Sequence, residues 1–407
     1  MRFCIGKCAE VKHTGVYSYP YIIADIYPSR YLLKHRGNQY IYNNYNPDLT
    51  MNTVEPLRFY DSILPYAKCT GSNYDIGFTH GKVGAKQIRH CMKTYKNLYK
   101  IDGGIEWPDA IAKTQLFVPV LKEKCPDLYE ELQGVADGSG FSLEDVVALN
   151  CRSEICLTTH TDGCTSVSQI NPDNGDLFIA QNWDWVGEIV DGLMILDIEK
   201  EGKPRMIMVA EAGIIGKYGF NSSGLGLVMN AIMSTASDFS HLPIHLAIRK
   251  CLECETFEEA YSSLQDNGVA SCVNLMIADK SGKFGTIECS PVGFVPIQPV
   301  DGQSFHTNHL FGETKFVKDF PQDNSIFRLN RVKELSVSAP ATANSIRERL
   351  SDTKNAPYSI CGFLKPGTGI GTFVTVDTII VNVNTGVGEL SIGKPCDNPT
   401  RYKLFFE

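Results

Sequence analysis

The sequence changes character near residue 163. Before that point, residues 69–160 carry the spacing of amphipathic helices, with helix starts predicted at Ser72 or Asn73 and at Ser142. After it, alternating polar and apolar residues with turn signals between them predict antiparallel strands. A helical segment that gives way to a run of hairpins predicts a fold of the α+β class.

The strongest hairpin signal is Asp173-Asn174-Gly175-Asp176, between predicted strands at Cys164–Ile170 and Leu177–Gln181. Two helical segments, near 243–264 and 342–353, interrupt the strand pattern. Further strands are predicted at Leu193–Glu199, Met206–Ala210, Gly224–Met229, Val273–Ala278, Phe284–Cys289 and Phe373–Asn382.

The composition narrows the classes of function. Apolar residues make up 43% of the chain and charged residues 21%, as in a globular protein with a sizeable core. Lys and Arg number 38 against 46 Asp and Glu, a net charge of −8, which argues against a nucleic-acid partner because a polyanion binder needs basic patches. No apolar run approaches the roughly 18–20 residues of a membrane helix, so no membrane partner is expected.

The two ends of the sequence favour a cytoplasmic location. The first residues have no apolar stretch of signal-peptide length, and the final KLFFE is not an SKL-type peroxisomal ending. Residues 1–65, rich in Tyr and Asn, are expected to form an N-terminal extension that is poorly ordered or loosely packed, unless Met51 is the true start. The 14 cysteines are expected to be mostly buried thiols.

The Gly163-Cys164 pair gives the most specific prediction of a chemical reaction. A Cys that opens the first strand, preceded by Gly, suits an intramolecular acyl shift in which the Cys164 thiolate attacks the Gly163 carbonyl. Hydrolysis of that thioester frees Cys164 as a new N-terminus. Its α-amine, with an ordinary pKa of about 7.7–8, can then activate its own thiol. The alternative is an ordinary buried Cys in a strand.

Two further segments carry candidate groups. Asp184, in Gln181-Asn182-Trp183-Asp184-Trp185, lies on the return strand of the hairpin and is predicted to come close to the start of the first strand. Its carboxylate could position an α-ammonium or orient the thiol; the alternative is a turn or capping Asp. Asn308, in Phe305-His306-Thr307-Asn308-His309, could donate to a developing oxyanion.

No metal and no resident cofactor are expected. The spacing of His306 and His309 would suit two ligands of a zinc ion, but the sequence offers no third ligand at a fitting spacing. The Gly367-Thr-Gly-Ile-Gly371 run precedes a strand and has no following Lys, unlike a phosphate-binding loop.

Taken together, these segments resemble the acyl-coenzyme A:6-aminopenicillanic acid acyltransferase (isopenicillin N acyltransferase) family of N-terminal nucleophile hydrolases. The resemblance runs from about residue 69 to about residue 400. Its marks include Cys69-Thr-Gly, Ile76-Gly-Phe-Thr-His-Gly81, Leu149-Asn-Cys-Arg-Ser-Glu154, Asp162-Gly-Cys-Thr165, Gln181-Asn-Trp-Asp184, Glu211-Ala-Gly-Ile-Ile-Gly-Lys217, Gly219-Phe-Asn-Ser222, Glu288-Cys-Ser-Pro291, His306-Thr-Asn-His309 and Pro357-Tyr-Ser-Ile-Cys361.

The resemblance implies a four-layer αββα sandwich made as a precursor that cuts itself between Gly163 and Cys164. It implies Cys164 as nucleophile, Asp184 as its catalytic neighbour and Asn308 as oxyanion-hole donor. Ser290 and Trp183 are implied to line the substrate pocket or to support processing.

One departure bears on the substrate. Where the penicillin-forming enzymes carry a Ser-Arg pair, this chain has Gly371 and Thr372. An Arg that could grip a substrate carboxylate with two hydrogen bonds is missing at that position, which argues against the penicillin substrate.

The predicted protein is a self-processing N-terminal-cysteine acyltransferase or amidohydrolase. Residues 66–163 would form the α-chain and 164–407 the β-chain of a heterodimer, together one structural domain. A small acyl amide or an acyl-coenzyme A thioester would acylate Cys164, and an amine or water would take the acyl group. Natural-product metabolism is the setting that the resemblance suggests. The alternatives are a strict amide hydrolase of aminoacyl amines and, in another class, an uncleaved Cys-rich metal-binding or structural protein.

Overall fold

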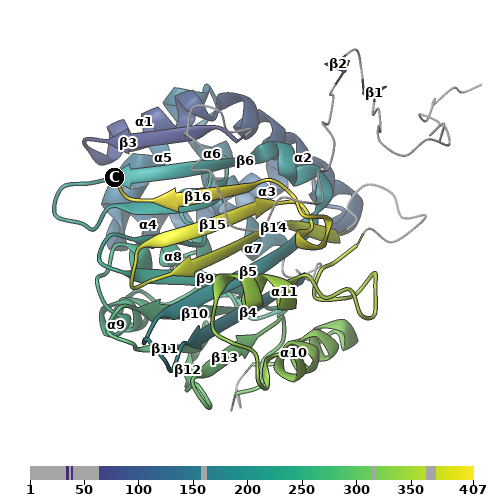
Figure 1. Ribbon diagram of the computed structural model, residues 1–407. Helices are drawn as coiled ribbons and strands as arrows, with labels where there is room; N and C mark the ends of the chain where they lie inside the picture. The colour runs from purple at the N-terminus through teal and green to yellow at the C-terminus, as the bar shows by residue number, and fades with distance from the viewer. Residues whose placement is uncertain (1–33, 36–37, 40–63, 157–162, 313–316, 364–372) are drawn as a thin grey trace, which may run out of the picture. The chain divides into compact units, whose positions relative to one another are not determined.

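The computed structural model describes residues 34–35, 38–39, 64–156, 163–312, 317–363 and 373–407 (Figure 1). The chain divides into two units, Met1–Val54 and Glu55–Glu407. Within the first, the described residues are β1 (Lys34–His35) and β2 (Asn38–Gln39), which pair antiparallel. The predicted extension over 1–65 thus falls almost wholly outside the described residues, and the proposed chain boundaries stay predictions.

The helices of the second unit lie in two blocks, one before residue 163 and one after it. They are α1 (Asn73–Val83), α2 (Ala85–Gly103), α3 (Trp107–Thr114), α4 (Val118–Lys124), α5 (Pro126–Ser139), α6 (Leu143–Asn150), α7 (Arg152–Cys156), α8 (Ile244–Leu252), α9 (Phe257–Asn267), α10 (Asp323–Ser336) and α11 (Ala343–Leu350).

Two of the predicted helix starts are confirmed by their caps. Of the two candidates at the first helix, Ser72 is the N-cap, and its hydroxyl and backbone form a reciprocal capping box with Asp75. Ser142 caps α6 by accepting from the backbone N–H of Asp145. Such caps contribute about 1 kcal/mol each because they satisfy backbone N–H groups that the helix leaves unpaired.

The strands form two sheets. One has eight strands in the order β12-β11-β10-β9-β8-β7-β6-β3, and the other has six in the order β13-β4-β5-β14-β15-β16. Apart from β3, which runs parallel to β6, neighbouring strands are antiparallel. Their bounds are β3 (Tyr66–Thr70), β4 (Gly163–Ile170), β5 (Leu177–Val186), β6 (Leu193–Glu199), β7 (Met206–Glu211), β8 (Gly219–Asn221), β9 (Leu225–Ala231), β10 (Val273–Asp279), β11 (Phe284–Ser290), β12 (Gly293–Ile297), β13 (Gln303–His306), β14 (Phe373–Asn382), β15 (Val387–Ile392) and β16 (Arg401–Phe405).

The two sheets pack face to face between helices. Strands β4 and β5 contact β9 and β10 across the sheet interface. Helices α1, α2, α8 and α9 contact the eight-stranded sheet, whereas α10 and α11 contact the six-stranded one (Figure 1). The predicted α+β class and its four αββα layers are therefore confirmed.

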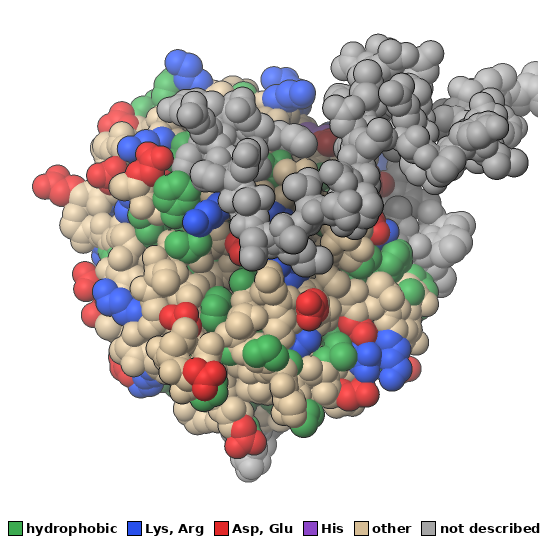
Figure 2. Space-filling view, in the orientation of Figure 1, with side chains coloured by type: hydrophobic (Ala, Val, Ile, Leu, Met, Phe, Trp, Pro, Cys, Tyr) green, Lys and Arg blue, Asp and Glu red, His purple; other side chains and the backbone are tan. Residues whose placement is uncertain are grey.

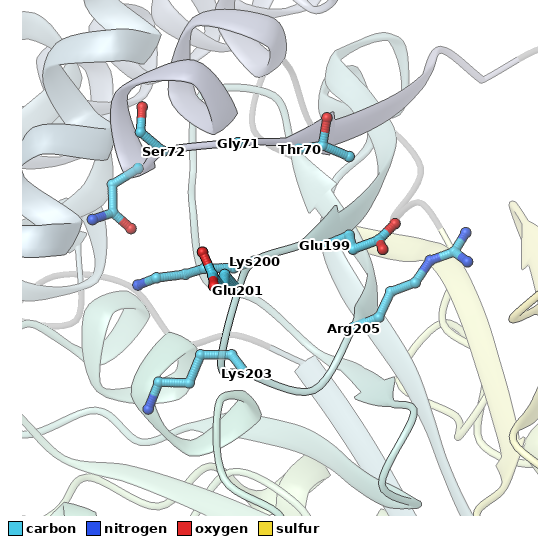
Figure 3. A pocket seen from close by; sticks show the side chains of 9 residues that line it. Thr70, Gly71, Ser72, Glu199, Lys200, Glu201, Lys203 and Arg205 are labelled. Carbon is cyan, nitrogen blue, oxygen red and sulfur yellow. The ribbon is translucent and has the colours of Figure 1, made fainter.

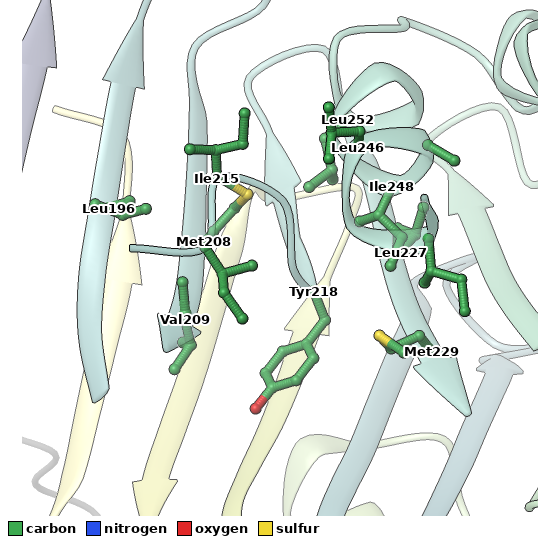
Figure 4. Close-up of a cluster of buried hydrophobic side chains, with 14 of the residues drawn as sticks. Leu196, Met208, Val209, Ile215, Tyr218, Leu227, Met229, Leu246, Ile248 and Leu252 are labelled. Atoms are coloured by element: carbon green, nitrogen blue, oxygen red, sulfur yellow. The ribbon is translucent and has the colours of Figure 1, made fainter. Parts of the chain in front are cut away.

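The apolar face of α8 shows how a helical layer is held to its sheet. Leu246, Ile248 and Leu252 lie over the eight-stranded sheet beside Ile215 and Leu227, and all five are fully buried (Figure 4). Burying one such side chain contributes about 1.5–3 kcal/mol relative to leaving it in water.

The surface is charged and mixed. On the face in Figure 2, the described acidic and basic side chains are interspersed rather than gathered by sign. Within the described part of the chain, no helix combines the length and the hydropathy that crossing a bilayer would require.

Two helix expectations need correction. The single helical stretch near 243–264 is two helices, because Thr256 starts α9 with a new cap to the N–H of Glu259. Helix α10 was not expected at all. Its buried positions include the polar residues Ser325, Arg328 and Ser336, which hide its apolar periodicity.

Candidate active site

Cys164 is the second residue of β4 and is fully buried. It pairs across the hairpin with Trp183 on β5, so the two side chains share a face of the sheet. The Trp183 ring meets that of Tyr218, which precedes β8 of the other sheet, and β4 itself contacts β9 and β10 of that sheet. This places Cys164 on the face where the two sheets meet.

Gly163 and Asp184 lie directly opposite each other in the same ladder. A Cβ added at Gly163 would come within 2.9 Å of the Asp184 Cβ and 3.1 Å of its Oδ2. Only Gly therefore fits here without displacing the carboxylate. The hairpin does bring Asp184 to the start of β4, as the turn signal predicts, and the carboxylate lies beside the Gly163–Cys164 peptide.

Asp184 is held from its other side. The Thr375 hydroxyl on β14 donates to Asp184 Oδ1 at 2.6 Å, and the same hydroxyl accepts from the backbone N–H of Gly362 at 2.8 Å. Gly362 packs so closely that a Cβ there would lie 3.2 Å from the carboxylate. Asp184 is thus a nearly buried, oriented carboxylate rather than a surface turn residue.

Asn308 follows β13, which pairs with β4 at the edge of the six-stranded sheet. Its Oδ1 accepts from the backbone N–H of Cys164 at 2.8 Å, and its Nδ2 donates to the carbonyl of Ala231 at 2.9 Å. The backbone N–H of Asn308 donates to the Ser325 hydroxyl at 2.8 Å. The nitrogen that would become the α-amine of a cleaved chain is therefore in direct contact with this amide.

Arg328, on α10, also belongs to this cluster, although the sequence analysis did not single it out. It is only 2% exposed, and its guanidinium donates to the Cys164 carbonyl, to the Thr165 hydroxyl at 3.1 Å and to Asn308 Oδ1 at 2.8 Å. The available signal was spacing: Arg328 shares the i, i+3, i+4, i+7 stripe of α10 with Ser325, Leu329 and Val332.

A network of charged and aromatic groups lies beside Trp183. The Lys217 ammonium sits 3.0 Å from the centre of the Trp183 ring and 2.5 Å from Glu211 Oε2, which also binds Arg152 at 2.9 Å. Burial lowers the pKa of Lys217 to about 8, with Glu211 opposing the effect. Burial acts to raise the pKa of Glu211, but the charges of Arg152 and Lys217 outweigh it and lower the pKa to about 2.

Asp377 on β14 completes this network. The Tyr218 hydroxyl donates to its Oδ2 at 2.5 Å. Burial raises the pKa of Asp377 to about 7, with the hydrogen bond from Tyr218 and the charge of Lys217 opposing the rise. The Tyr218 ring meets the Trp183 ring edge-on at 6.2 Å, so this network supports the strand on which Trp183 and Asp184 lie.

Ser290 lies in the other sheet, where its hydroxyl is held by a turn. It ends β11 in the eight-stranded sheet, and its hydroxyl donates to the carbonyl of Gly293 at 3.0 Å, closing the turn into β12. Among the described residues, no hydrogen bond links Ser290 to Cys164, Asp184 or Asn308. Its pocket or processing role stays a prediction.

The histidines flanking Asn308 have protein partners. The ring of His306 contacts Glu288 Oε1 at 3.0 Å, and that of His309 contacts the Ser325 hydroxyl at 2.8 Å. Within the described ranges, no group of three or more His, Cys, Asp or Glu side chains is arranged to hold a metal ion.

A cavity of about 910 Å³ lies elsewhere, around the end of β3 and the β6–β7 turn (Figure 3). Two of its cations are paired: Lys200 binds Asp127 at 3.0 Å and Arg205 binds Asp197 at 2.6 Å. None of the predicted site residues lines this cavity.

Comparison with known proteins identifies the family. The family described as acyl-coenzyme A:6-aminopenicillanic acid acyl-transferase matches residues 170–394. A relative from Emericella nidulans, the acyl-coenzyme A:6-aminopenicillanic-acid-acyltransferase 40 kDa form, is 31% identical over 342 residues, which cover 82% of this chain and 94% of the relative. The chain belongs to this acyltransferase family. The predicted resemblance is thereby confirmed, and the protein is an enzyme of an acyltransferase family.

Solved structures with weaker similarity were also found. Penicillin V acylase from Agrobacterium tumefaciens aligns with a TM-score of 0.42 and 16% identity, over 60% of this chain and 86% of its own. A mutant of conjugated bile acid hydrolase from Clostridium perfringens aligns with a TM-score of 0.40 and 12% identity, over 60% and 92%.

Proposed function

We propose that this member of the acyltransferase family cleaves itself between Gly163 and Cys164 and then uses Cys164 as an N-terminal nucleophile. The observation that carries the proposal is the 2.8 Å hydrogen bond from the Cys164 backbone nitrogen to Asn308 Oδ1. A strand residue normally satisfies its backbone N–H within the sheet. Here a side-chain amide holds the nitrogen that the chemistry would release as an amine.

The cleavage step is an acyl shift from nitrogen to sulfur. The Cys164 thiol attacks the Gly163 carbonyl carbon, the peptide C–N bond breaks, and the departing nitrogen takes up the thiol proton. Water then hydrolyses the thioester to a Gly163 carboxylate and a free Cys164. Support comes from Gly163 itself, because the absent Cβ lets the Asp184 carboxylate lie against the scissile peptide.

Turnover would reuse the same groups. The neutral α-amine of Cys164 takes the thiol proton, and the sulfur attacks the acyl carbonyl. The leaving amine or thiol then takes the proton from the ammonium. One hydrogen of the Asn308 Nδ2 group binds Ala231, and the second is the proposed oxyanion donor. Asp184 orients the amine, and the Trp183 ring forms a wall beside the thiol.

The proposed products of cleavage are an α-chain of residues 66–163, preceded by the 1–65 extension, and a β-chain of 164–407, held together as a heterodimer. Contacts that cross the proposed cut support a complex that survives cleavage: β3 of the α-chain pairs along its length with β6 of the β-chain, and α2 packs on β7.

For the substrate, we propose a small acyl amide or an acyl-coenzyme A thioester as donor and water or a small amine as acceptor. The Emericella relative is named for acyl-coenzyme A and 6-aminopenicillanic acid. The Gly371-Thr372 departure, in a segment outside the described residues, argues against 6-aminopenicillanic acid as the acceptor here.

The test is acylation of Cys164. Wild type is incubated with a series of acyl p-nitroanilides and acyl-coenzyme A thioesters, and the Cys164 peptide is read by mass spectrometry. We expect an acyl adduct on Cys164. Its release as a free acid even when amine is added indicates a hydrolase, whereas release as an amide in the presence of amine indicates a transferase. Cys164→Ala is expected to be neither cleaved nor acylated. Cys254→Ala, which alters a thiol between α8 and α9, is expected to behave as wild type. Cleavage or turnover by Cys164→Ala would contradict the proposal.

A further inference from the structure

Arg328 connects three parts of the site through one side chain. Its Nη1 donates to the Cys164 carbonyl and to the Thr165 hydroxyl, and its Nη2 donates to Asn308 Oδ1. Helix α10 packs on β4 and β13, so the guanidinium enters the site from the outer helical layer. A planar fork of this kind fixes direction as well as distance, which a Lys ammonium cannot do.

The fork determines which way the Asn308 amide faces. A guanidinium has donors only, and the backbone nitrogen of Cys164 is also a donor. The atom that accepts from both must be the amide oxygen, so Nδ2 is turned toward Ala231, where it donates at 2.9 Å. Without Arg328, one of the two contacts that hold the oxygen in this orientation is lost.

We propose that Arg328 is a positioning residue for acyl transfer: it holds the Asn308 amide and the Cys164 main chain in the orientation in which oxyanion donor, nucleophile and α-amine act together. This inference rests on the proposed function of Cys164. In this role Arg328 acts through the groups that its guanidinium contacts, the Asn308 amide and the Cys164 backbone.

The charge of Arg328 has a second consequence. Its Nη2 and the Cys164 nitrogen each lie 2.8 Å from the same oxygen, so they are no more than twice that distance apart. A fixed positive charge this near disfavours the ammonium and favours the neutral amine that turnover needs. Coulomb's law with an effective dielectric between 20 and 80 gives a decrease of about 0.5 to 2 in the pKa of the α-amine.

Other ionisable groups also surround the Cys164 nitrogen and thiol. Asp184 on β5 lies across the ladder and opposes Arg328, because a carboxylate favours the ammonium. On the sheet interface, the Tyr218–Asp377 pair and Lys217 lie against Trp183. The test therefore changes Arg328 while all of these stay in place.

The test uses processed full-length enzyme, with cleavage verified by intact mass before any rate is measured. Arg328→Gln removes both the positive charge and the planar, two-pronged set of guanidinium donors, whereas Arg328→Lys keeps the charge and loses only that donor geometry. Arg331→Gln is the matched control: it lies on the same helix three residues on and pairs with Asp352 at 2.7 Å and Glu334 at 2.9 Å, outside the site. The readouts are kcat, KM and the pH profile of kcat/KM with an acyl p-nitroanilide.

For Arg328→Gln, we expect kcat to fall about 10- to 100-fold with KM little changed, since misplacing a reacting group by about 1 Å has this effect. The acidic limb of kcat/KM should move to higher pH by about 0.5 to 2 units. Arg328→Lys should lose kcat while its acidic limb stays near wild type, and Arg331→Gln should match wild type in both.

Two results would overturn the inference. One is a wild-type kcat in Arg328→Lys, which would show that the fork is not needed. The other is an unmoved acidic limb in Arg328→Gln. Arg328→Gln could also show a cooperative thermal unfolding transition yet stay uncleaved while Arg331→Gln is cleaved. Arg328 then already positions Asn308 and Cys164 in the precursor, which supports the inference. An active wild type that proves uncleaved refutes the proposed function instead, and the mass measurement reveals this first.

Discussion

Replacing Asn308 by Asp separates two roles of one side chain. The change keeps the shape and the Oδ1 acceptor, so the contacts from Cys164 N and Arg328 Nη2, both 2.8 Å, persist. It removes the Nδ2 donor and sets an oxygen against the Ala231 carbonyl at the place of a 2.9 Å hydrogen bond. That loss is expected to cost about 1–3 kcal/mol of unfolding free energy, partly offset by the new charge pair with Arg328.

The effect on turnover should be larger than the effect on stability. Removing one oxyanion donor typically lowers kcat by about 10²–10³, or 2.7–4 kcal/mol, so Asn308→Asp is expected to fold but to turn over at that reduced rate. The assay is kcat with an acyl p-nitroanilide, scaled by the fraction of cleaved enzyme, alongside urea unfolding.

Asn150→Asp is the matched control. Asn150 is also fully buried, accepts from the N–H of Ile215 and donates to the carbonyls of Val146 and Gly213, away from Cys164. It should lose stability without losing kcat per folded molecule. A wild-type kcat in Asn308→Asp would refute the assignment of Asn308 as oxyanion donor.

Three further outcomes are expected. Gly163→Ala places a Cβ 2.9 Å from that of Asp184 and should slow precursor cleavage, followed by intact mass over time, by about 10- to 100-fold; cleavage at the wild-type rate would count against the steric argument. Thr375→Val removes the 2.6 Å bond to Asp184 and should cost about 1–3 kcal/mol in urea unfolding and slow cleavage as well; unchanged cleavage would show that the carboxylate needs no such support. Burial raises the pKa of Asp377 to about 7 from an ordinary value near 3.9. The protonated carboxyl therefore adds to the free energy of unfolding below about pH 4, and this contribution is lost as the pH rises through 7. It amounts to on the order of 4 kcal/mol in total. Asp377→Asn, which leaves Tyr218 an acceptor, should therefore be more stabilising, or less destabilising, at pH 8 than at pH 5, and an equal effect at both would contradict this account.

Much of the sheet structure could be predicted because buried strands are encoded locally. The predicted strands at Leu193–Glu199 and Phe373–Asn382 coincide with β6 and β14, where runs of β-branched and apolar residues are buried. The edge strands β12 and β13 were missed, because they are short and half-exposed and take their strand form from distant partners.

In the candidate site, too, local contacts could be predicted from the sequence and contacts between distant residues could not. The approach of Asp184 to Gly163 could be predicted because a tight turn fixes the register of a hairpin. The contact between Asn308 and Cys164 joins residues 144 positions apart and depends on β13 pairing with β4, which no local pattern encodes. Arg328 lies on a helix whose buried stripe is partly polar, so hydrophobic periodicity does not reveal it.

The most direct test is the N-terminus of the active enzyme. Intact-mass and N-terminal analysis of purified, active protein should find two chains, the second beginning at Cys164. The Cys164→Ala variant should remain a single uncleaved chain. Full activity in a single unbroken polypeptide would contradict the central claim that a self-generated terminal cysteine performs the chemistry.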